Sequence, residues 1–214
     1  MSVPAALDHV VIAGPQLDAL VDWFAQRTGV VAAPGGTHPT GTANALVAFT
    51  VGGRRGRHYL ELIGPDPQAA AAPTTFGIAG LAAPVVCTYS VHPDDIDAVV
   101  ARATAAGHDP GPVVRLSRRT PDGALLEWRL TKGHESRRDL PFLIDWGQTA
   151  HPGFGDLPAI ELVSFERVEP DPVAARVALD ALGLPAGALA QIVPGETPAF
   201  RLTVRTAAGE DVLL

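Results

Sequence analysis

Two ionisable side chains, His9 and Glu61, stand in the middle of short apolar runs, LDHVVIA and HYLELIG. Both runs are typical of β-strands, where residues two apart share a face, so we expect Leu7 to point the same way as His9. A buried glutamate is rare without a partner, because an uncompensated charge is costly there. The pair is a candidate for acid–base chemistry or metal ligation in a common cleft. The other interpretation is structural: a His9–Glu61 hydrogen bond, or an ion pair between Glu61 and an arginine.

Further polar and aromatic residues could contact a small ligand: His38, Asn44, Tyr59, Arg118, Trp146 and His151. The planar guanidinium of Arg118 could clamp a carboxylate or phosphate, or pair at the surface with a nearby acidic residue. His38 and Asn44 flank a glycine-containing loop, where they could bind a ligand or form turns. Trp146 is either an aromatic wall of the cleft or a core residue.

The composition excludes several classes of protein. The chain has 214 residues, 47% of them hydrophobic and 18% charged, and its formal charge is −7. This balance favours a packed core and disfavours nucleic-acid binding. A single cysteine, Cys87, excludes an intrachain disulfide and a multi-cysteine metal site. We find no membrane-spanning run and no secretion signal, so we expect a soluble cytoplasmic protein without a membrane partner. A homodimer stays open.

The elements that must position these residues follow a repeated order. The first copy has a strand at 7–13, a helix at 16–28 and strands at 44–51 and 58–64, with 34–43 as a loop and 65–80 as a linker. The second has a strand at 85–91, a helix at 94–106 and strands at 113–119, 124–130 and 141–147. A shorter third copy has strands at 159–166, 199–205 and 211–214 and a helix at 172–182. An offset of 79 residues aligns the first two copies and matches His9 with Thr88 and Glu61 with Ile144.

Several stretches together resemble the glyoxalase-like domain family of the vicinal oxygen chelate superfamily. They are LDHVVIA, PGGTHPTGTANALVAF, YLELIGP, Leu116-Ser117-Arg118, Pro121-Asp122-Gly123, Trp128, PFLIDWG and His151-Pro152. The resemblance covers about residues 5–155. It implies an α+β fold of paired βαβββ modules, about 5–64 and 84–147, whose curled mixed sheets form an open cleft. We expect residues 1–155 to form this glyoxalase-like domain and 156–214 to form a C-terminal βαββ half-module packed on the same core.

The resemblance also bears on function. In metal-using members each module supplies two ligands, and His9 and Glu61 fit the first-module positions. Thr88 and Ile144 stand at the second-module positions and are poor ligands, while Asp145 should face away. A divalent metal is therefore possible but not favoured, and the sequence leaves the identity of any cofactor unknown. The resemblance implies a small-molecule ligand and either lyase- or isomerase-type chemistry with Glu61 as general base and His9 beside it, or a resistance-type protein that only binds or sequesters its ligand.

Overall fold

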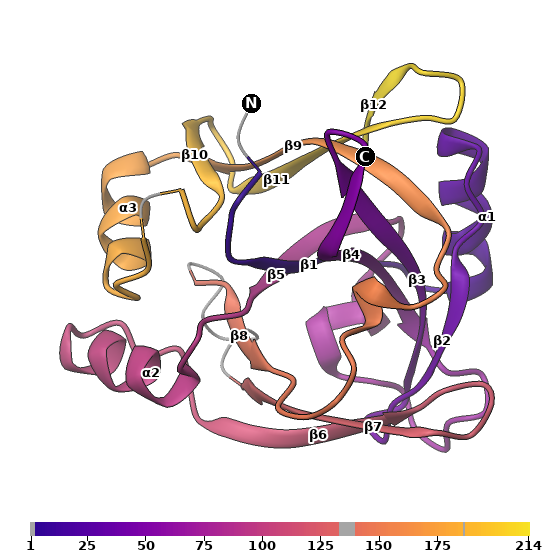
Figure 1. Cartoon of the computed structure of the whole chain (residues 1–214), viewed down its shortest axis with the longest axis horizontal. Helices are drawn as coiled ribbons and strands as arrows, with labels where there is room; N and C mark the ends of the chain where they lie inside the picture. The colour runs from indigo at the N-terminus through magenta and orange to yellow at the C-terminus, as the bar shows by residue number, and fades with distance from the viewer. Residues whose placement is uncertain (1–2, 133–139, 186) are drawn as a thin grey trace.

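The computed structural model describes residues 3–132, 140–185 and 187–214 (Figure 1). The strands of the first half are β1 (Leu7–Ala13), β2 (Ala33–Thr37), β3 (Thr42–Val51), β4 (Arg54–Pro65), β5 (Val85–Val91), β6 (Val113–Arg119), β7 (Leu125–Thr131) and β8 (Phe142–Asp145). The later strands are β9 (Ala159–Glu169), β10 (Gln191–Pro194), β11 (Ala199–Arg205) and β12 (Asp211–Leu213). The helices are α1 (Leu17–Thr28), α2 (Ile96–Ala105) and α3 (Pro172–Asp180), with short 3-10 segments η1 (Thr75–Gly80) and η2 (Pro152–Phe154).

Local sequence signals explain where the helices begin and end. Helix α1 ends at Gly29, whose φ of 75° is a left-handed conformation that glycine adopts without steric cost. Helix α2 begins at Asp95, whose side chain accepts a hydrogen bond from the backbone N–H of Ala98. Helix α3 begins in the same way at Asp171, followed by Pro172 in the first turn. None of the helices in the described part of the chain is long and apolar enough to cross a membrane.

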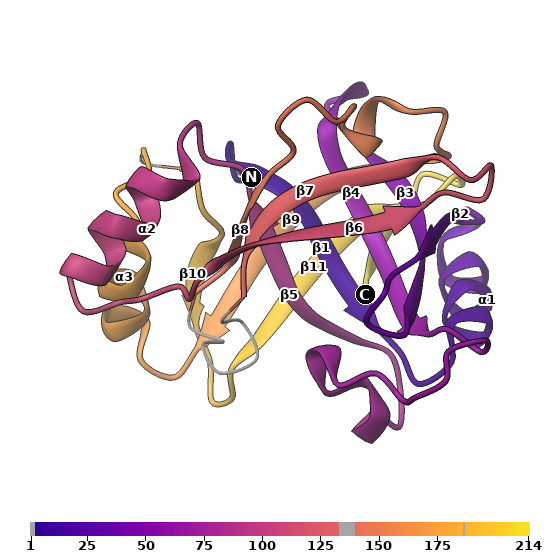
Figure 2. The same ribbon diagram turned by 90° about the horizontal axis from the view of Figure 1, so that it is seen from below.

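The strands form one mixed sheet that closes on itself. The order β3-β2-β6-β7-β8-β5-β1-β4 returns to its start, because β3 also pairs with β4. Figures 1 and 2 show β6 and β7 facing β1 and β4 across this ring. The α+β class and the curled mixed sheet are confirmed, and the expected open cleft is a closed ring. Strand β9 continues the sheet outside the ring, parallel to β3, and carries β10, β11 and β12.

Two apolar clusters lie on opposite faces of β1, one inside the ring and one outside it. The inner cluster lines the ring and includes Val11, Tyr59, Trp128 and Ile144. The outer cluster lies under α1, α2, α3, β9 and β11 and includes Leu7, Val10, Phe24 and Phe165. Every residue of β1 is buried. Apart from Asp8 and His9, its sequence is apolar on both faces, which reflects this burial.

The segment 34–43, expected as a loop, contains β2 and the start of β3. The misleading signal is the pair Gly35 and Gly36, which is typical of turns. A Cβ on Gly35 would lie 2.3 Å from Oδ1 of Asn44, and one on Gly36 would lie 1.9 Å from the carbonyl oxygen of Arg119. The glycines therefore let β2 approach β3 and β6 closely, and the pairing of Thr37 with Arg119 closes the ring.

The expected facing of Leu7 is also wrong. In the pairing of β1 with β5, Leu7 lies opposite Val91 and His9 lies opposite Ser90, so Asp8 is an extra residue on β1. A β-bulge of this kind places two successive side chains on one side of the sheet. Leu7 consequently points to the outer cluster and His9 lines the ring cavity, while Asp8 contacts His9 and Trp146 behind the cavity wall.

Candidate functional site

A cavity of about 770 Å³, including its mouth, opens inside the ring. One wall carries polar side chains from β1, β3 and β4, and the opposite wall comes from β6, β7 and β8 and is apolar apart from Arg118 on β6. The 3-10 segment η1 lies at one end of the ring, and it contributes Thr75 and Phe76 to the lining (Figures 1 and 2). The residues that line the cavity include His9, His38, Asn44, Tyr59, Glu61, Arg118, Trp128, Lys132, Phe142, Ile144 and Trp146.

Most of the residues singled out from the sequence meet at this cavity. His9, Glu61, His38, Asn44, Tyr59, Arg118 and Trp146 all line it. His151 does not line the cavity. It lies behind Trp146, at the start of η2, with ring centroids 5.4 Å apart. The residues that line the cavity therefore form one site, and His151 packs behind Trp146 and supports that site from outside the cavity.

His9, Glu61 and Asn44 form a continuous polar contact on three neighbouring strands. The Nε2 atom of His9 lies 3.6 Å from Oε2 of Glu61. The other carboxylate oxygen of Glu61 accepts a hydrogen bond of 2.5 Å from Nδ2 of Asn44. The buried Oδ1 of Asn44 has no hydrogen-bond donor among the described residues. A buried acceptor without a donor is costly, and this oxygen is packed against Gly35.

Arg118 is buried in the cavity wall, which excludes the interpretation of a surface ion pair. Its side chain donates from Nη1 to the carbonyl oxygen of Gly35. No carboxylate of the described residues lies within ion-pair distance of it, although the residue is only 5% exposed. A buried cation is normally paired, because desolvation is expensive. The remaining donors of this guanidinium are thus available to an anionic group in the cavity.

Aromatic rings hold the imidazole of His9 in place. Tyr59 stacks on it, with centroids 4.6 Å apart and planes 20° apart, and Phe142 meets its edge at 5.3 Å. Burial and the nearby carboxylates of Asp8 and Glu61 raise the pKa of Tyr59 well above its usual value, so its hydroxyl stays protonated. Burial also lowers the pKa of His38, more than the Glu61 carboxylate raises it. His38 is therefore a neutral group at the mouth, bonded to the Thr42 hydroxyl at 2.9 Å.

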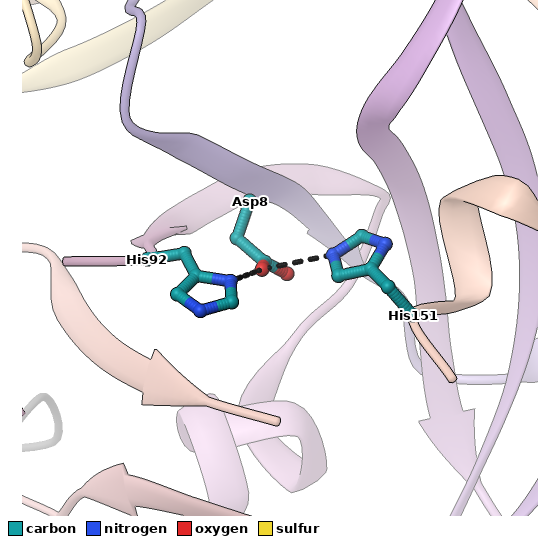
Figure 3. Close-up of side chains that lie close together, drawn as sticks. All are labelled: Asp8, His92 and His151. Atoms are coloured by element: carbon teal, nitrogen blue, oxygen red, sulfur yellow. Dashed lines mark hydrogen bonds and ion pairs between the residues drawn. The ribbon is translucent and has the colours of Figure 1, made fainter. Parts of the chain in front are cut away.

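Asp8 is the site residue that sequence reasoning missed. It is fully buried, and its Oδ1 lies 2.7 Å from Nδ1 of His9. Its Oδ2 accepts from Nε1 of Trp146 at 3.1 Å and lies 3.0 Å from Nε2 of His151. Figure 3 shows the carboxylate between His151 and His92, and His92 is 3.4 Å away. Strand alternation assigned Asp8 to the opposite face, and only the bulge in β1 turns it to this side.

The environment of Asp8 keeps it ionised. Burial by itself would raise the pKa of this carboxyl group. The contacts with His151, His9 and His92 outweigh that effect and hold the pKa well below its usual range. The carboxylate is therefore a fixed negative charge directly behind the cavity wall.

The lining residues do not fit a metal ion. Ile144 lies in the cavity at the position matched to Glu61 and has no donor atom. Thr88, matched to His9, lies in a separate groove beside Cys87 and Phe200. Asp145 faces away and binds Arg129 at 2.7 Å. His9 and Glu61 are thus left as two ligands, whereas three or four are usual.

One group of three residues with metal-ligand atoms does occur in the described part of the chain: Asp8, His92 and His151. The Nδ1 atom of His151 accepts a hydrogen bond of 3.0 Å from the backbone N–H of Gly153. This ring nitrogen carries no proton, so the proton of a neutral His151 sits on Nε2 and points at Asp8. A ligating histidine needs the opposite arrangement, with its second nitrogen donating. The group is therefore a hydrogen-bond cluster, and we derive no chemistry from a metal there.

Comparisons with known proteins address the fold. A family model described as "Glyoxalase-like domain" matches residues 7–183. A crystal structure of a hypothetical protein from Staphylococcus aureus is similar over 97% of both chains, with a TM-score of 0.61 and 14% sequence identity. Methylmalonyl-CoA epimerase from Streptomyces coelicolor is 20% identical with a TM-score of 0.45, covering 70% of this chain and 100% of its own. A mutant 4-hydroxymandelate synthase from the same organism is 15% identical with a TM-score of 0.48, covering 98% and 61%. The search of curated proteins gives no match.

Proposed function

This chain belongs to the glyoxalase-like domain family of the vicinal oxygen chelate superfamily, and from that premise we propose that it binds a small carboxylate-bearing carbonyl compound in the ring cavity and transfers a proton on it. In this proposal the reaction is of the lyase or isomerase type. The observation that carries it is the lining of the cavity, where Arg118 on β6, with no carboxylate of the described residues within ion-pair distance, faces the same space as the paired His9 and Glu61.

The proposed fold detail is a pair of βαβββ modules at about 5–64 and 84–147, followed by the half-module 156–214. The register of β1 and β5 supports it. These strands run antiparallel with Val10 opposite Tyr89, and these two residues are themselves 79 positions apart. A twofold axis that relates the two modules would pass between Val10 and Tyr89. Such an axis agrees with the offset of 79 residues between the two copies in the sequence.

Arg118 is the proposed anchor for the carboxylate of the ligand. Its guanidinium offers parallel donors that match a carboxylate, and it is held from behind by the Gly35 carbonyl. The apolar wall of Trp128, Phe142 and Ile144 would cover the carbon skeleton and exclude water.

Glu61 is the proposed general base. It is 8% exposed, and it is oriented by Asn44 and His9 from two sides. A carboxylate fixed in this way can take a proton from the carbon next to a carbonyl group. The neighbouring donors, Arg118 and the protonated Tyr59, would stabilise the negative charge that develops on the substrate. The substrate carbon loses a proton, Glu61 gains it, and the reaction ends when the proton returns to carbon.

Deuterium exchange tests this proposal. Purified protein is incubated in D₂O with 2-oxobutyrate, 2-oxoglutarate or 3-hydroxy-2-oxo acids, and the loss of the proton next to the carbonyl group is followed by ¹H NMR. We expect exchange above the buffer rate with at least one acid, and Glu61→Gln should slow it about 10²- to 10⁴-fold. Arg118→Ala should weaken binding about 10- to 100-fold, the effect of losing a charge-assisted hydrogen bond. Arg115→Ala, an exposed arginine on the same strand, is the matched control.

The same experiment separates catalysis from sequestration, the second function that the resemblance implies. The cavity is lined by the aromatic rings of Tyr59, Trp128 and Trp146. Such rings can pack against a ligand in a protein that only binds it, and equally in an enzyme that converts it. An acid that stabilises the protein in a thermal-shift assay and is recovered without deuterium would favour sequestration. Exchange that persists unchanged in Glu61→Gln would contradict the assignment of the general base.

A further inference from the structure

We propose that Asp8 is the positioning residue that fixes the proton of His9 on Nδ1, so that the other ring nitrogen, Nε2, faces Glu61 ready to receive a proton. This inference rests on the proposed function for its kinetic consequence, whereas the proton position is a property of the free protein.

The Asp8 carboxylate decides which nitrogens around it carry a proton. An ionised carboxylate has acceptor atoms only, so each nitrogen that contacts it must carry the hydrogen. The indole of Trp146 can only donate. His151 has its proton on Nε2, because its Nδ1 accepts from Gly153. His9 must therefore carry a proton on Nδ1, the atom 2.7 Å from Asp8.

The same carboxylate thus selects opposite tautomers in two histidines. His9 is protonated on Nδ1 and His151 on Nε2. In water a neutral imidazole interconverts between both forms, and the hydrogen bond made by one nitrogen decides the state of the other. Trp146 and His151 together hold Oδ2, which leaves Oδ1 for His9 alone. The buried position of Asp8 removes water as a competing partner.

The consequence at the cavity concerns one proton. In the resting protein, the unprotonated Nε2 of His9 lies 3.6 Å from Oε2 of Glu61. After Glu61 takes a proton from the substrate carbon, Nε2 can accept that proton and form an imidazolium between two carboxylates, Asp8 and Glu61. Return of the proton reverses the path, so the proton balance closes without an additional group. If neutral His9 carried its proton on Nε2 instead, this nitrogen could not accept the proton from Glu61.

Nitrogen NMR of the histidine side chains tests the inference without a substrate. In ¹⁵N-labelled wild-type protein near pH 7.5, long-range ¹H–¹⁵N correlations distinguish the two tautomers. Assignment uses His9→Gln and His151→Gln, each of which removes one set of signals. We expect the Nδ1–H form for His9 and the Nε2–H form for His151. A His9 ring that carries a proton on Nε2, whether neutral or doubly protonated, would overturn the inference, whatever the protein does to any substrate.

The variant Asp8→Asn tests the consequence. A side-chain amide presents both a donor and an acceptor, so we expect His9 to move to the Nε2–H form. With an exchanging 2-oxo acid, the turnover rate should fall about 10²- to 10⁴-fold, while the concentration for half-saturation changes less than threefold, because Asp8 does not line the cavity. Asp145→Asn, the same change at a carboxylate that faces Arg129 outside the cavity, is the matched control.

Two further results keep the inference distinct from the proposed function. The variant Trp146→Phe removes one donor to Oδ2 and leaves Oδ1 to His9, so it should keep the Nδ1 proton and serves if Asp8→Asn does not fold. Loss of the Nδ1 proton in Trp146→Phe would count against Asp8 as its determinant. Should no acid exchange while both tautomers are as stated, the proposed function fails and the positioning role of Asp8 stands as a feature of a binding site.

Discussion

At the scale of single residues, one buried carboxylate organises the site. Asp8 has no exposed surface, yet its pKa lies well below the usual range because its contacts with three histidines outweigh the effect of burial. Such a group stabilises the fold fully above its unfolded pKa of about 3.9, and the contribution is lost as the pH falls through the lower folded value. Its stabilising effect therefore disappears only in acid.

This leads to a prediction for Asp8→Asn. We expect the variant to lose about 2–4 kcal/mol of unfolding free energy at pH 7, because an amide leaves buried donors poorly matched. The difference from wild type should shrink as the pH is lowered from 5 to 3, since the wild type then loses its advantage. Urea unfolding at each pH measures it. A difference that is the same at pH 3 and pH 7 would mean that the charge of Asp8 does not stabilise the fold.

At the scale of elements, the closure of the ring depends on two glycines in β2. Gly36 has a φ of 140°, and an added Cβ would lie 1.9 Å from the carbonyl oxygen of Arg119. Gly36→Ala should cost about 2–4 kcal/mol through backbone strain and the steric clash together. Gly123→Ala is the control, because Gly123 also has a positive φ, 89°, but nothing within 4 Å of the added atom. Equal losses in urea unfolding for the two variants would show that close approach of β2 to β6 is not what requires glycine.

At the scale of the whole molecule, the segment 156–214 shares the core of the rest. Phe165, Leu202 and Val204 lie in the same cluster as Leu7 and Val10. The carboxylate of Glu161 on β9 accepts from the backbone N–H groups of Gly52 and Gly53, in the turn between β3 and β4. The shared apolar cluster and these hydrogen bonds together attach the last strands to the outer face of the ring.

We therefore expect a fragment of residues 1–155 not to fold on its own. Loss of β9 and β11 would expose the outer cluster, and burial of one phenylalanine of this kind is worth about 3–5 kcal/mol, a large part of a domain's net stability. Circular dichroism melting of the fragment beside the full chain measures this. A cooperative transition at the same temperature in the fragment would show instead that 1–155 is an independent domain.

The sequence by itself determined the three helices, most of the strands and most of the cavity residues. The two-residue period of a strand predicted that Tyr59 and Glu61 share a face, and local sequence signals placed the three helices within two residues of their observed bounds. These patterns are local, because a strand or helix fixes the direction of each side chain over a few residues. His9, Asn44 and Arg118 could be singled out for the same reason: polar groups in or beside apolar strands are visible in the sequence.

Only the tertiary structure decided the rest. The bulge that turns Asp8 toward His9 depends on how β1 pairs with a strand about 80 positions away, and no local pattern encodes that register. The glycines of β2 look like a turn until β3 and β6 approach them. Arg118 could equally have been a surface residue, because its burial is set by the closed ring and not by its neighbours in the chain. Side-chain direction is a local property, whereas partner, burial and proton position arise from contacts between distant segments.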